Sequence, residues 1–502
     1  MTNTYSHYRH SFGPAALVLT LICSLCVFAT IPASAQSLFR QLSQDSFTNG
    51  SSQHMTEVEP GAFAYGPTIV TAFQVGRIYG GGSADIGFAT STNAGISWTN
   101  GYLPGLTQWY EGGSNSAASD ASVAYDLKHN EWLISTLPIG NNNLVAVSRS
   151  SDGLHWDNPI YVTNNINSDK DWINCDNTPT SPYYGSCYVE FDSPADGDLL
   201  FMSTSSDGGL TWSSPLNTAA GDNGLGGNPV VQPNGTVVVG YADFNGGVSA
   251  FTSSNGGHSW NAAVSISSAP MHGLAGGLRS FGLPSTAIDG AGTVYVSWPD
   301  CRFESGCSAN DIVFSTSNDG VHWTSVVRVA SDPIGSGVDH FIHGMGIDPK
   351  TSGSTAHLAV TYYFYPVANC GNSCTLYAGY TQSSDGGKTW TAGRQLSGGM
   401  QISWLPSTLS GYMVADYVAT VFAGPRAFPL YVIAHPPSGG LLQEAVYTEG
   451  YGFPFTGQEQ TFSSKDDKPI PDFNSYIRPR EFYDQDNEFP VHPAKTVPPD
   501  NR

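Results

Sequence analysis

Acidic, aromatic and arginine side chains gather where the apolar runs of this chain begin and in the irregular stretches between them. Carboxylates can act as acid, base or nucleophile, and aromatic rings and arginines can orient a sugar, so this mixture suits glycoside chemistry. The first group lies at the starts of apolar runs: Glu59, Asp120, Asp171, Trp172, Arg279, Asp339, His340, Asp416 and Tyr417. The second group lies in irregular stretches: Arg77, Asp85, Asp243, Asp300, Arg302 and Glu304.

Each of these residues also has a purely structural interpretation. Acidic side chains at strand starts often satisfy backbone donors or hold neighbouring sheets together. A metal site is not expected, because His340 and His343 lie three residues apart and would point to opposite faces of a strand. The Asp-rich loops follow no calcium-loop spacing. We therefore predict neither a metal nor another cofactor.

An eight-residue pattern, called here the box motif, recurs along the chain. Its copies are SSDGGLTW at 205–212, SSDGGKTW at 383–390, STNAGISW at 91–98, SSNGGHSW at 253–260, and the shorter SSDGLHW at 150–156 and SNDGVHW at 317–323. The Ser and Asp side chains can bond the backbone of their own turn, glycine supplies positive φ, and the Trp ring can pack on a sheet. The motif therefore predicts a self-stabilised turn between two strands, with a structural role.

The spacing of the box motif predicts a β-propeller of four-stranded antiparallel blades. The box tryptophans lie 48 to 67 residues apart, at Trp98, Trp156, Trp212, Trp260, Trp323 and Trp390. This interval gives room for four short strands and their loops. Alternating runs such as 292–298 and 311–317 supply the strands, and the box falls between the third and the fourth. No long helical period occurs after Gln36.

The ends of the chain set the blade count and the boundaries. A unit without a box lies at 416–449, and a strand from near Phe39 to Phe47 would complete it. The sequence thus favours seven blades, with six as the alternative. We expect a signal peptide at 1–35, the propeller at 36–460 and a Pro- and charge-rich C-terminal tail at 461–502.

Strand parity places the candidate residues on one face. In four-stranded antiparallel blades the turns between strands 1 and 2 share a face with the boxes. The loops between strands 2 and 3, and those between blades, lie on the opposite face, called here the mouth face. These irregular loops carry the candidate residues, and function concentrates in such loops.

The N-terminal segment and the cysteines indicate export. An apolar run from about Ala15 to Ile31 precedes a small-residue cleavage site that ends after Ala35. Six of the eight cysteines follow in three close pairs, which predicts the disulfides Cys175–Cys187, Cys301–Cys307 and Cys370–Cys374. The net charge of −22 argues against nucleic acid or an anionic membrane as partner. We expect a secreted monomer with no membrane anchor in the mature chain.

The box motif fits the pattern S-x-D-x-G-x-x-W, and on it the chain resembles the sialidase-like propellers with BNR, or Asp-box, repeats. The resemblance covers roughly residues 55–450. It is specific for the fold, but such propellers include sialidases, xyloglucan-cleaving glycosidases and sorting receptors. It implies a glycan or glycoconjugate as substrate or ligand.

For an active sialidase, the resemblance implies three arginines on the substrate carboxylate, a Tyr nucleophile assisted by a Glu, and an Asp acid. In this chain it implies Tyr417 as nucleophile, Glu59 as its base, Asp85 or Asp300 as acid, and Arg77, Arg279 and Arg302 as the carboxylate grip. Asp171, Trp172, Asp339 and Asp416 complete the expected substrate-binding set. The first inner strand departs from the family, because Glu59 and Pro60 stand where Arg-Ile-Pro is usual.

Three functions are compatible with these observations. The first is a secreted glycoside hydrolase of exo-sialidase type that acts on extracellular glycans. The second is a non-catalytic propeller that binds glycan or protein. The third is an endo-acting glucanase that uses paired carboxylates and needs no arginine grip.

Overall fold

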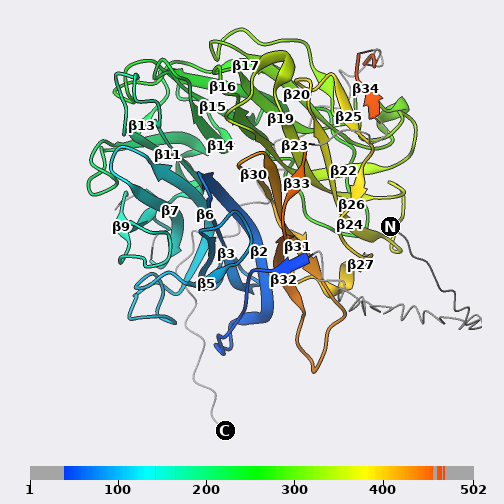
Figure 1. The fold of residues 1–502 in the computed structure, drawn as a ribbon. Coiled ribbons are helices and arrows are strands. Elements are labelled where there is room, and N and C mark those ends of the chain that lie inside the picture. The colour runs from blue at the N-terminus through cyan, green and yellow to red at the C-terminus, as the bar shows by residue number, and fades with distance from the viewer. Residues whose placement is uncertain (1–38, 142, 164–165, 456–460, 466, 470–502) are drawn as a thin grey trace, which may run out of the picture. The chain divides into compact units, whose positions relative to one another are not determined.

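The structure is a computed structural model that describes residues 39–141, 143–163, 166–455, 461–465 and 467–469 (Figure 1). Regular structure in these residues is β, apart from short 3-10 turns at Pro194–Asp196, Ser305–Cys307, Gly353–Thr355 and Ile402–Trp404. The all-β prediction is confirmed. The expected signal peptide and residues 470–502 of the expected tail lie outside the described residues. The described part contains no helix with the length and apolar character needed to cross a membrane.

The repeated unit is an antiparallel ladder of four strands. The first three ladders are β2 (Ser52–Tyr65), β3 (Thr68–Ile78), β4 (Ser83–Ser91) and β5 (Thr99–Tyr102); β6 (Ala117–Asp126), β7 (Glu131–Ile139), β8 (Ala146–Ser150) and β9 (Ile160–Tyr161); and β10 (Asp169–Cys175), β11 (Cys187–Ser193), β12 (Leu199–Ser205) and β13 (Leu216–Asn217). The next three are β14 (Gly224–Val231), β15 (Val237–Asp243), β16 (Gly247–Ser253) and β17 (Val264–Ser268); β18 (Ser285–Ile288), β19 (Val294–Asp300), β20 (Asp311–Ser317) and β21 (Val327–Arg328); and β22 (Asp339–Ile347), β23 (Leu358–Tyr365), β24 (Thr375–Ser383) and β26 (Arg394–Gln395).

The last ladder joins the N-terminal end of the described chain to residues 419–449. It contains β30 (Ala419–Ala423), β31 (Arg426–Ala434) and β32 (Glu444–Glu449), and its fourth strand is β1 (Phe39–Gln41). Phe39 lies opposite Glu449, and Gln41 lies opposite Tyr447. The N-terminal strand therefore completes the unit that lacks a box, as the sequence predicted.

The first strands of the ladders lie beside one another in chain order. Each first strand contacts the first strand of the next ladder, in the order β2, β6, β10, β14, β18, β22 and β30. β30 in turn contacts β2. Glycine permits the close approach at two of these steps. A Cβ on Gly61 would lie 2.1 Å from the Ala121 carbonyl oxygen, and one on Gly344 would lie 2.0 Å from that of Val418. The fold therefore brings the start of every ladder into one inner layer.

The box motif forms the turn that its residues predict. In the copy at 205–212 the Gly209 amide donates to Ser205 Oγ at 3.0 Å, and the Thr211 amide donates to Asp207 Oδ1 at 3.0 Å. The Trp212 ring nitrogen donates to the Gly209 carbonyl oxygen at 3.2 Å. In the first copy the Ala94 amide donates to the Pro67 carbonyl, which lies in the turn between β2 and β3. The box therefore shares a face with that turn.

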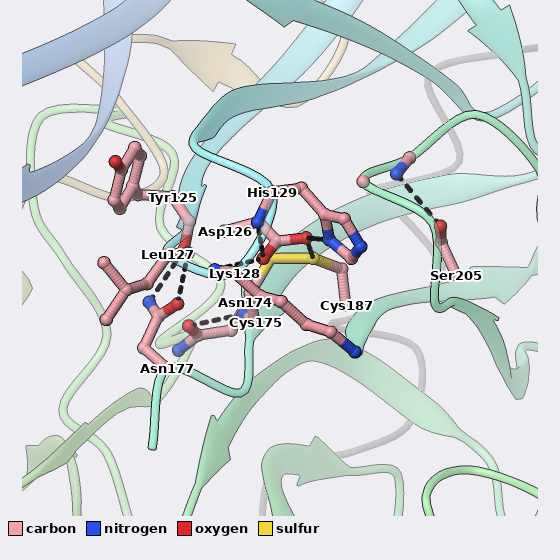
Figure 2. Close-up of a disulfide and its surroundings, with 12 residues drawn as sticks. Tyr125, Asp126, Leu127, Lys128, His129, Asn174, Cys175, Asn177, Cys187 and Ser205 are labelled. Atoms are coloured by element: carbon pink, nitrogen blue, oxygen red, sulfur yellow. Dashed lines mark hydrogen bonds and ion pairs between the residues drawn. A yellow bond between two sulfur atoms is a disulfide. The ribbon is translucent and has the colours of Figure 1, made fainter. Parts of the chain in front are cut away.

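The predicted disulfides Cys175–Cys187, Cys301–Cys307 and Cys370–Cys374 are present. Figure 2 shows the first, a cross-strand bridge between paired residues of β10 and β11. It lies against the turn that follows β6, where Asp126 accepts from the Lys128 amide at 3.0 Å and faces His129 Nδ1 at 2.6 Å. This bridge links the first and second strands of the third ladder.

Among the described residues, five short strands lie outside the ladders, and a sixth lies in the segment expected to be the C-terminal tail. The first group is β25 (Thr389–Thr391), β27 (Met400–Gln401), β28 (Ser407–Thr408), β29 (Gly411–Tyr412) and β33 (Phe453–Pro454). Thr461–Ser463, which the sequence assigned to the tail, form β34. This strand pairs with β25, with Phe462 opposite the box residue Trp390. The chain thus remains attached to the last box turn beyond the end of the last ladder.

Candidate functional site

Several first strands contain a bulge, and the bulges carry residues with unusual backbone conformations. Register shifts occur at Glu59, Asp120, Lys170 and Ile342, whose φ angles are 57°, 35°, 36° and 42°. Positive φ is unfavourable for side chains other than glycine, and such strain concentrates at functional sites. A bulge also redirects the side chain that it carries. Three of these four residues are charged, and the backbone at each has a conformation that a regular strand does not adopt.

These side chains take part in a buried ionic group, called here the central cluster, that consists of Glu59, Arg77, Asp120, Lys170, Arg279 and Asp416. The Arg279 guanidinium forms a bidentate pair with Asp416, with Nε 2.8 Å from Oδ1. Lys170 Nζ lies 3.1 Å from Asp416 Oδ2 and 3.3 Å from Asp120 Oδ1. All six residues are at most 4% exposed. The cluster therefore joins residues from both ends of the chain in a nearly water-free setting.

The pKa values of Glu59 and Asp416 are shifted in opposite directions. Burial raises the pKa of Glu59 well above its usual value, and the charges of Asp416 and Asp120 add to this effect. The pKa of Asp416 lies far below its usual value despite burial, because Arg279 and Lys170 stabilise the carboxylate. The pKa values of Glu59 and Asp416 are thus shifted apart, which is a useful division for acid and base roles.

Arg77 enters the cluster from β3 and is held mainly by backbone. Its Nη1 donates to the carbonyl oxygens of Ile78 at 2.8 Å and Gly82 at 2.5 Å, and its Nε lies 3.0 Å from Met413 Sδ. Burial, followed by the charge of Arg279, lowers the pKa of Arg77 to about 10. Backbone carbonyls thus fix the position of the guanidinium within the cluster.

Tyr417 follows Asp416 directly and lies on the other side of the cluster. Its hydroxyl oxygen accepts from the Ala121 amide at 2.9 Å, and its ring meets that of Trp172 edge-on at 5.0 Å. Burial and then the charge of Glu59 raise the pKa of Tyr417 well above its usual value. A cavity of about 280 Å³ extends from these two rings along the first strands, and its lining residues carry no charge other than what His343 could acquire.

The remaining predicted site residues lie outside the central cluster. Asp85 accepts from Thr107 Oγ1 at 2.8 Å, and burial raises its pKa to about 8. Asp300 forms a bidentate pair with Arg302, with 2.9 Å to Nε and 2.7 Å to Nη2. Asp339 Oδ2 lies 3.1 Å from His272 Nδ1. These groups have partners of their own, and no contact brings them to Tyr417.

Asp171 is fully buried on β10 beside Glu190, and burial raises the pKa of both carboxyls. Of the predicted set, the structure thus gathers Glu59, Arg77, Arg279, Asp416, Tyr417 and Trp172. Sequence reasoning gave Asp120 no specific role and overlooked Lys170. A lysine between Asp169 and Asp171 on an expected inner strand was the available signal.

A group near the fifth and sixth ladders has metal-ligand chemistry. Asp311, Asp332 and His340 present ligand atoms within 4.8 Å of one another. The Arg328 guanidinium lies between the two carboxylates, with 2.7 Å to each. It supplies the positive charge that a cation would bring, so we assign no metal to this group.

Comparisons with known proteins concern the fold. No family model and no curated protein matches the chain. Similar solved structures include a protein of unknown function from Dyadobacter fermentans (15% identity, 69% of this chain and 99% of that chain, TM-score 0.44) and the NanB sialidase from Streptococcus pneumoniae (13%, 81% and 70%, 0.41). The intramolecular trans-sialidase from Ruminococcus gnavus is another (14%, 78% and 92%, 0.38). At these values no site residue is transferred from them.

Proposed function

We propose that this protein is a secreted, sialidase-like propeller that acts as a glycoside hydrolase of exo-sialidase type on extracellular glycans. The observation that carries the proposal is that Glu59, Arg279 and Tyr417 lie together. Glu59 comes from a first strand, Arg279 from a loop between ladders, and Tyr417 from the last unit. A tyrosine, an acid whose pKa is raised and a guanidinium are the three kinds of group that the reaction needs. The charge of Glu59 acts on Tyr417, and Arg279 is bonded to the residue that precedes Tyr417.

In the proposed reaction the Tyr417 oxygen attacks the anomeric carbon, and Glu59 in its carboxylate form accepts the phenol proton. The bond from the anomeric carbon to the glycosidic oxygen breaks, and the acid donates a proton to that leaving oxygen. A neutral tyrosine suits a substrate that already carries a carboxylate, because a carboxylate nucleophile would be repelled. Arg279 would exchange Asp416 for the substrate carboxylate, which has the same bidentate geometry. Asp120 lies within the cluster and is better placed as the acid than Asp85 or Asp300, which have partners elsewhere.

We also propose that the ladders close into a ring of seven blades. The contacts between successive first strands, including that between β30 and β2, support closure. The pairing of β1 with β32 supports the seventh blade. The disulfides fit an oxidising compartment, in line with export after cleavage at Ala35.

The test is release of a fluorogenic sialoside by the purified mature protein. Wild type should show turnover, and Tyr417→Phe and Arg279→Ala should each reduce kcat/KM by at least about a hundredfold. Tyr447→Phe is the matched control, since this tyrosine lies on the last ladder, half-exposed, with its hydroxyl 3.3 Å from Gln41. No turnover by wild type, or equal loss in all three variants, would refute the catalytic proposal.

Burial of the central cluster favours a second candidate, a non-catalytic glycan-binding propeller. Each cluster residue is at most 4% exposed, and Arg279, Lys170 and Asp416 already satisfy one another. Such internal pairing is also what a purely structural ion network would show. Binding on a glycan array without sialoside turnover would establish this candidate.

A further inference from the structure

A small hairpin lies over the central cluster. It consists of β28 and β29, so we call it the 407–412 hairpin. Thr408 Oγ1 donates to the Gly411 carbonyl at 2.8 Å, and the Ser410 amide donates to Thr408 Oγ1 at 3.2 Å. Below it, Leu405, Met413 and Val414 are at most 2% exposed. The hairpin is therefore an internally bonded element with an apolar base.

The hairpin touches both arginines of the cluster. The Arg279 amide donates to the Tyr412 carbonyl, and the Tyr412 amide donates to the Gly277 carbonyl, both at 2.9 Å. Arg279 Nη1 lies 3.4 Å from Thr408 Oγ1, and Met413, which follows the hairpin, contacts Arg77. Three residues later the chain supplies Asp416. Movement of the hairpin would thus uncover Arg279 and alter the segment that carries its counter-charge.

Polar contacts hold the base of the hairpin against β2. Leu409 is 56% exposed and Tyr412 is 36% exposed, so the hairpin buries little of these apolar side chains. The side-chain amide of Gln53, on β2, forms two hydrogen bonds with the backbone of Ser407. Its Nε2 donates to the Ser407 carbonyl at 2.8 Å, and its Oε1 accepts from the Ser407 amide at 3.0 Å. Exposed hydrogen bonds break more readily than apolar packing, which favours local opening.

A glycine marks the docked position of the hairpin. Gly411 has a φ of 125°, and a Cβ there would lie 2.5 Å from the Gly277 carbonyl oxygen. Only a residue without a side chain can lie this close to the segment that carries Arg279. The close contact between Gly411 and Gly277 thus defines a closed position of the hairpin.

We propose that the 407–412 hairpin is a lid over the central cluster, and that Gln53 is the latch that holds it closed. The proposal rests on the proposed function in that it regulates access to the same site. Lid opening admits the anionic end of the substrate to Arg279, and lid closure excludes water around it.

The experiment measures opening without any substrate. Wild type, Gln53→Ala and Gly411→Ala are compared by amide hydrogen exchange and by acetylation of lysines with a water-soluble succinimidyl acetate. Loss of the latch should speed exchange within 407–412 and acetylation of Lys170 about tenfold. The exposed Lys388 in each sample is the internal reference.

Gln395→Ala is the matched control, because Gln395 is an exposed glutamine whose Nε2 donates to the Ser397 carbonyl at 2.7 Å. It should leave both rates at the wild-type value. Unchanged exchange of the hairpin in both test variants would overturn the proposal. So would faster exchange with Lys170 still protected, because the hairpin would then not be the cover. Lid opening in a protein without sialoside turnover would refute the proposed function and leave the lid standing.

Discussion

The box turns and the central cluster use the same carboxylate chemistry in opposite ways. Asp207 and Asp385 bond groups within four residues of themselves, including the hydroxyls of Thr211 and Thr389 at 2.6 Å. These bonds lower the pKa of both box carboxyls. In the cluster, Asp416 bonds Arg279 and Lys170, which lie 137 and 246 residues away.

The difference separates two sources of stability. A box turn is assembled from contiguous residues and needs little from the rest of the chain. The central cluster exists only after several ladders have packed, and removal of one member leaves other charges buried. Local turns should therefore tolerate damage, whereas the cluster should not.

Replacement of Asp416 by alanine should have the largest effect. Arg279 and Lys170 would lose a shared counter-charge, and breaking a buried pair costs about 3–5 kcal/mol. Urea unfolding followed by tryptophan fluorescence measures the loss. Asp207→Ala serves as the box-turn control, and a loss as small as that control's would contradict the comparison.

The pH dependence of stability should follow the buried acids of the interior. Burial raises the pKa of Glu57 to about 8, although Ser43 Oγ donates to it at 2.6 Å. Its contribution is therefore fully present below pH 4.5 and is lost as the pH rises toward 8. The full loss is on the order of 5 kcal/mol, at 1.4 kcal/mol for each unit between pKa 4.5 and about 8.

Unfolding free energies at pH 5 and pH 8 test this sign, and Glu57→Gln should flatten the profile in that window. The box carboxyls should have the opposite effect at low pH. Their pKa values are lowered in the folded protein, so the stability that they contribute is lost as the pH falls. A stability that rises from pH 5 to pH 8 in the wild type would show that the buried acids do not dominate.

Removal of the Cys175–Cys187 bridge should have an intermediate effect. The bridge closes a loop with a sequence separation of 12 residues, so Cys175→Ser with Cys187→Ser should lose about 3 kcal/mol in the chain-entropy model. This bridge sharpens the comparison between box turns and central cluster. It joins residues close in sequence, as a box turn does, but it is buried, as the cluster is. Thermal unfolding against the Cys370→Ser, Cys374→Ser pair, whose loop is shorter, gives the relative size.

Replacement of Asp385 by alanine should have the smallest effect, about 1–2 kcal/mol. The turn would lose its bonds from the Thr389 amide and hydroxyl, while Trp390 would keep its bond to the Gly387 carbonyl. Activity or binding per folded molecule should equal that of wild type. Complete loss of activity in a folded Asp385→Ala protein would contradict the separation of the two regions.

Much of the fold was predictable because its signals are local. The boxes, the alternating runs and the close cysteine pairs each specify contacts within one ladder. The addition of β1 to the last ladder was also foreseen, from a unit short of one strand. The pairing of β34 with β25 was not, because three residues within a Pro-rich segment carry too weak a strand pattern.

The candidate site was predictable only as a list of residue types. Strand parity grouped Glu59, Asp416 and Tyr417 with Arg302 and Asp339, since all lie near strand starts or in mouth-face loops. The sequence offered no means to distinguish an arginine that pairs with its own neighbour, as Arg302 does with Asp300, from one that reaches a distant partner. Lys170 was overlooked although it stands between Asp169 and Asp171 on an expected inner strand.

The sequence by itself determined the repeated ladder, its turns and its disulfides, because these depend on residues within one repeat and on backbone preferences that act at short range. The tertiary structure alone decided which charges meet. Bulges at Glu59, Asp120 and Lys170 turn side chains toward a common centre, and Arg279 and Asp416 arrive there from distant loops. Coulomb interactions among buried groups depend on separations in space, and those separations are fixed only when all the ladders have packed.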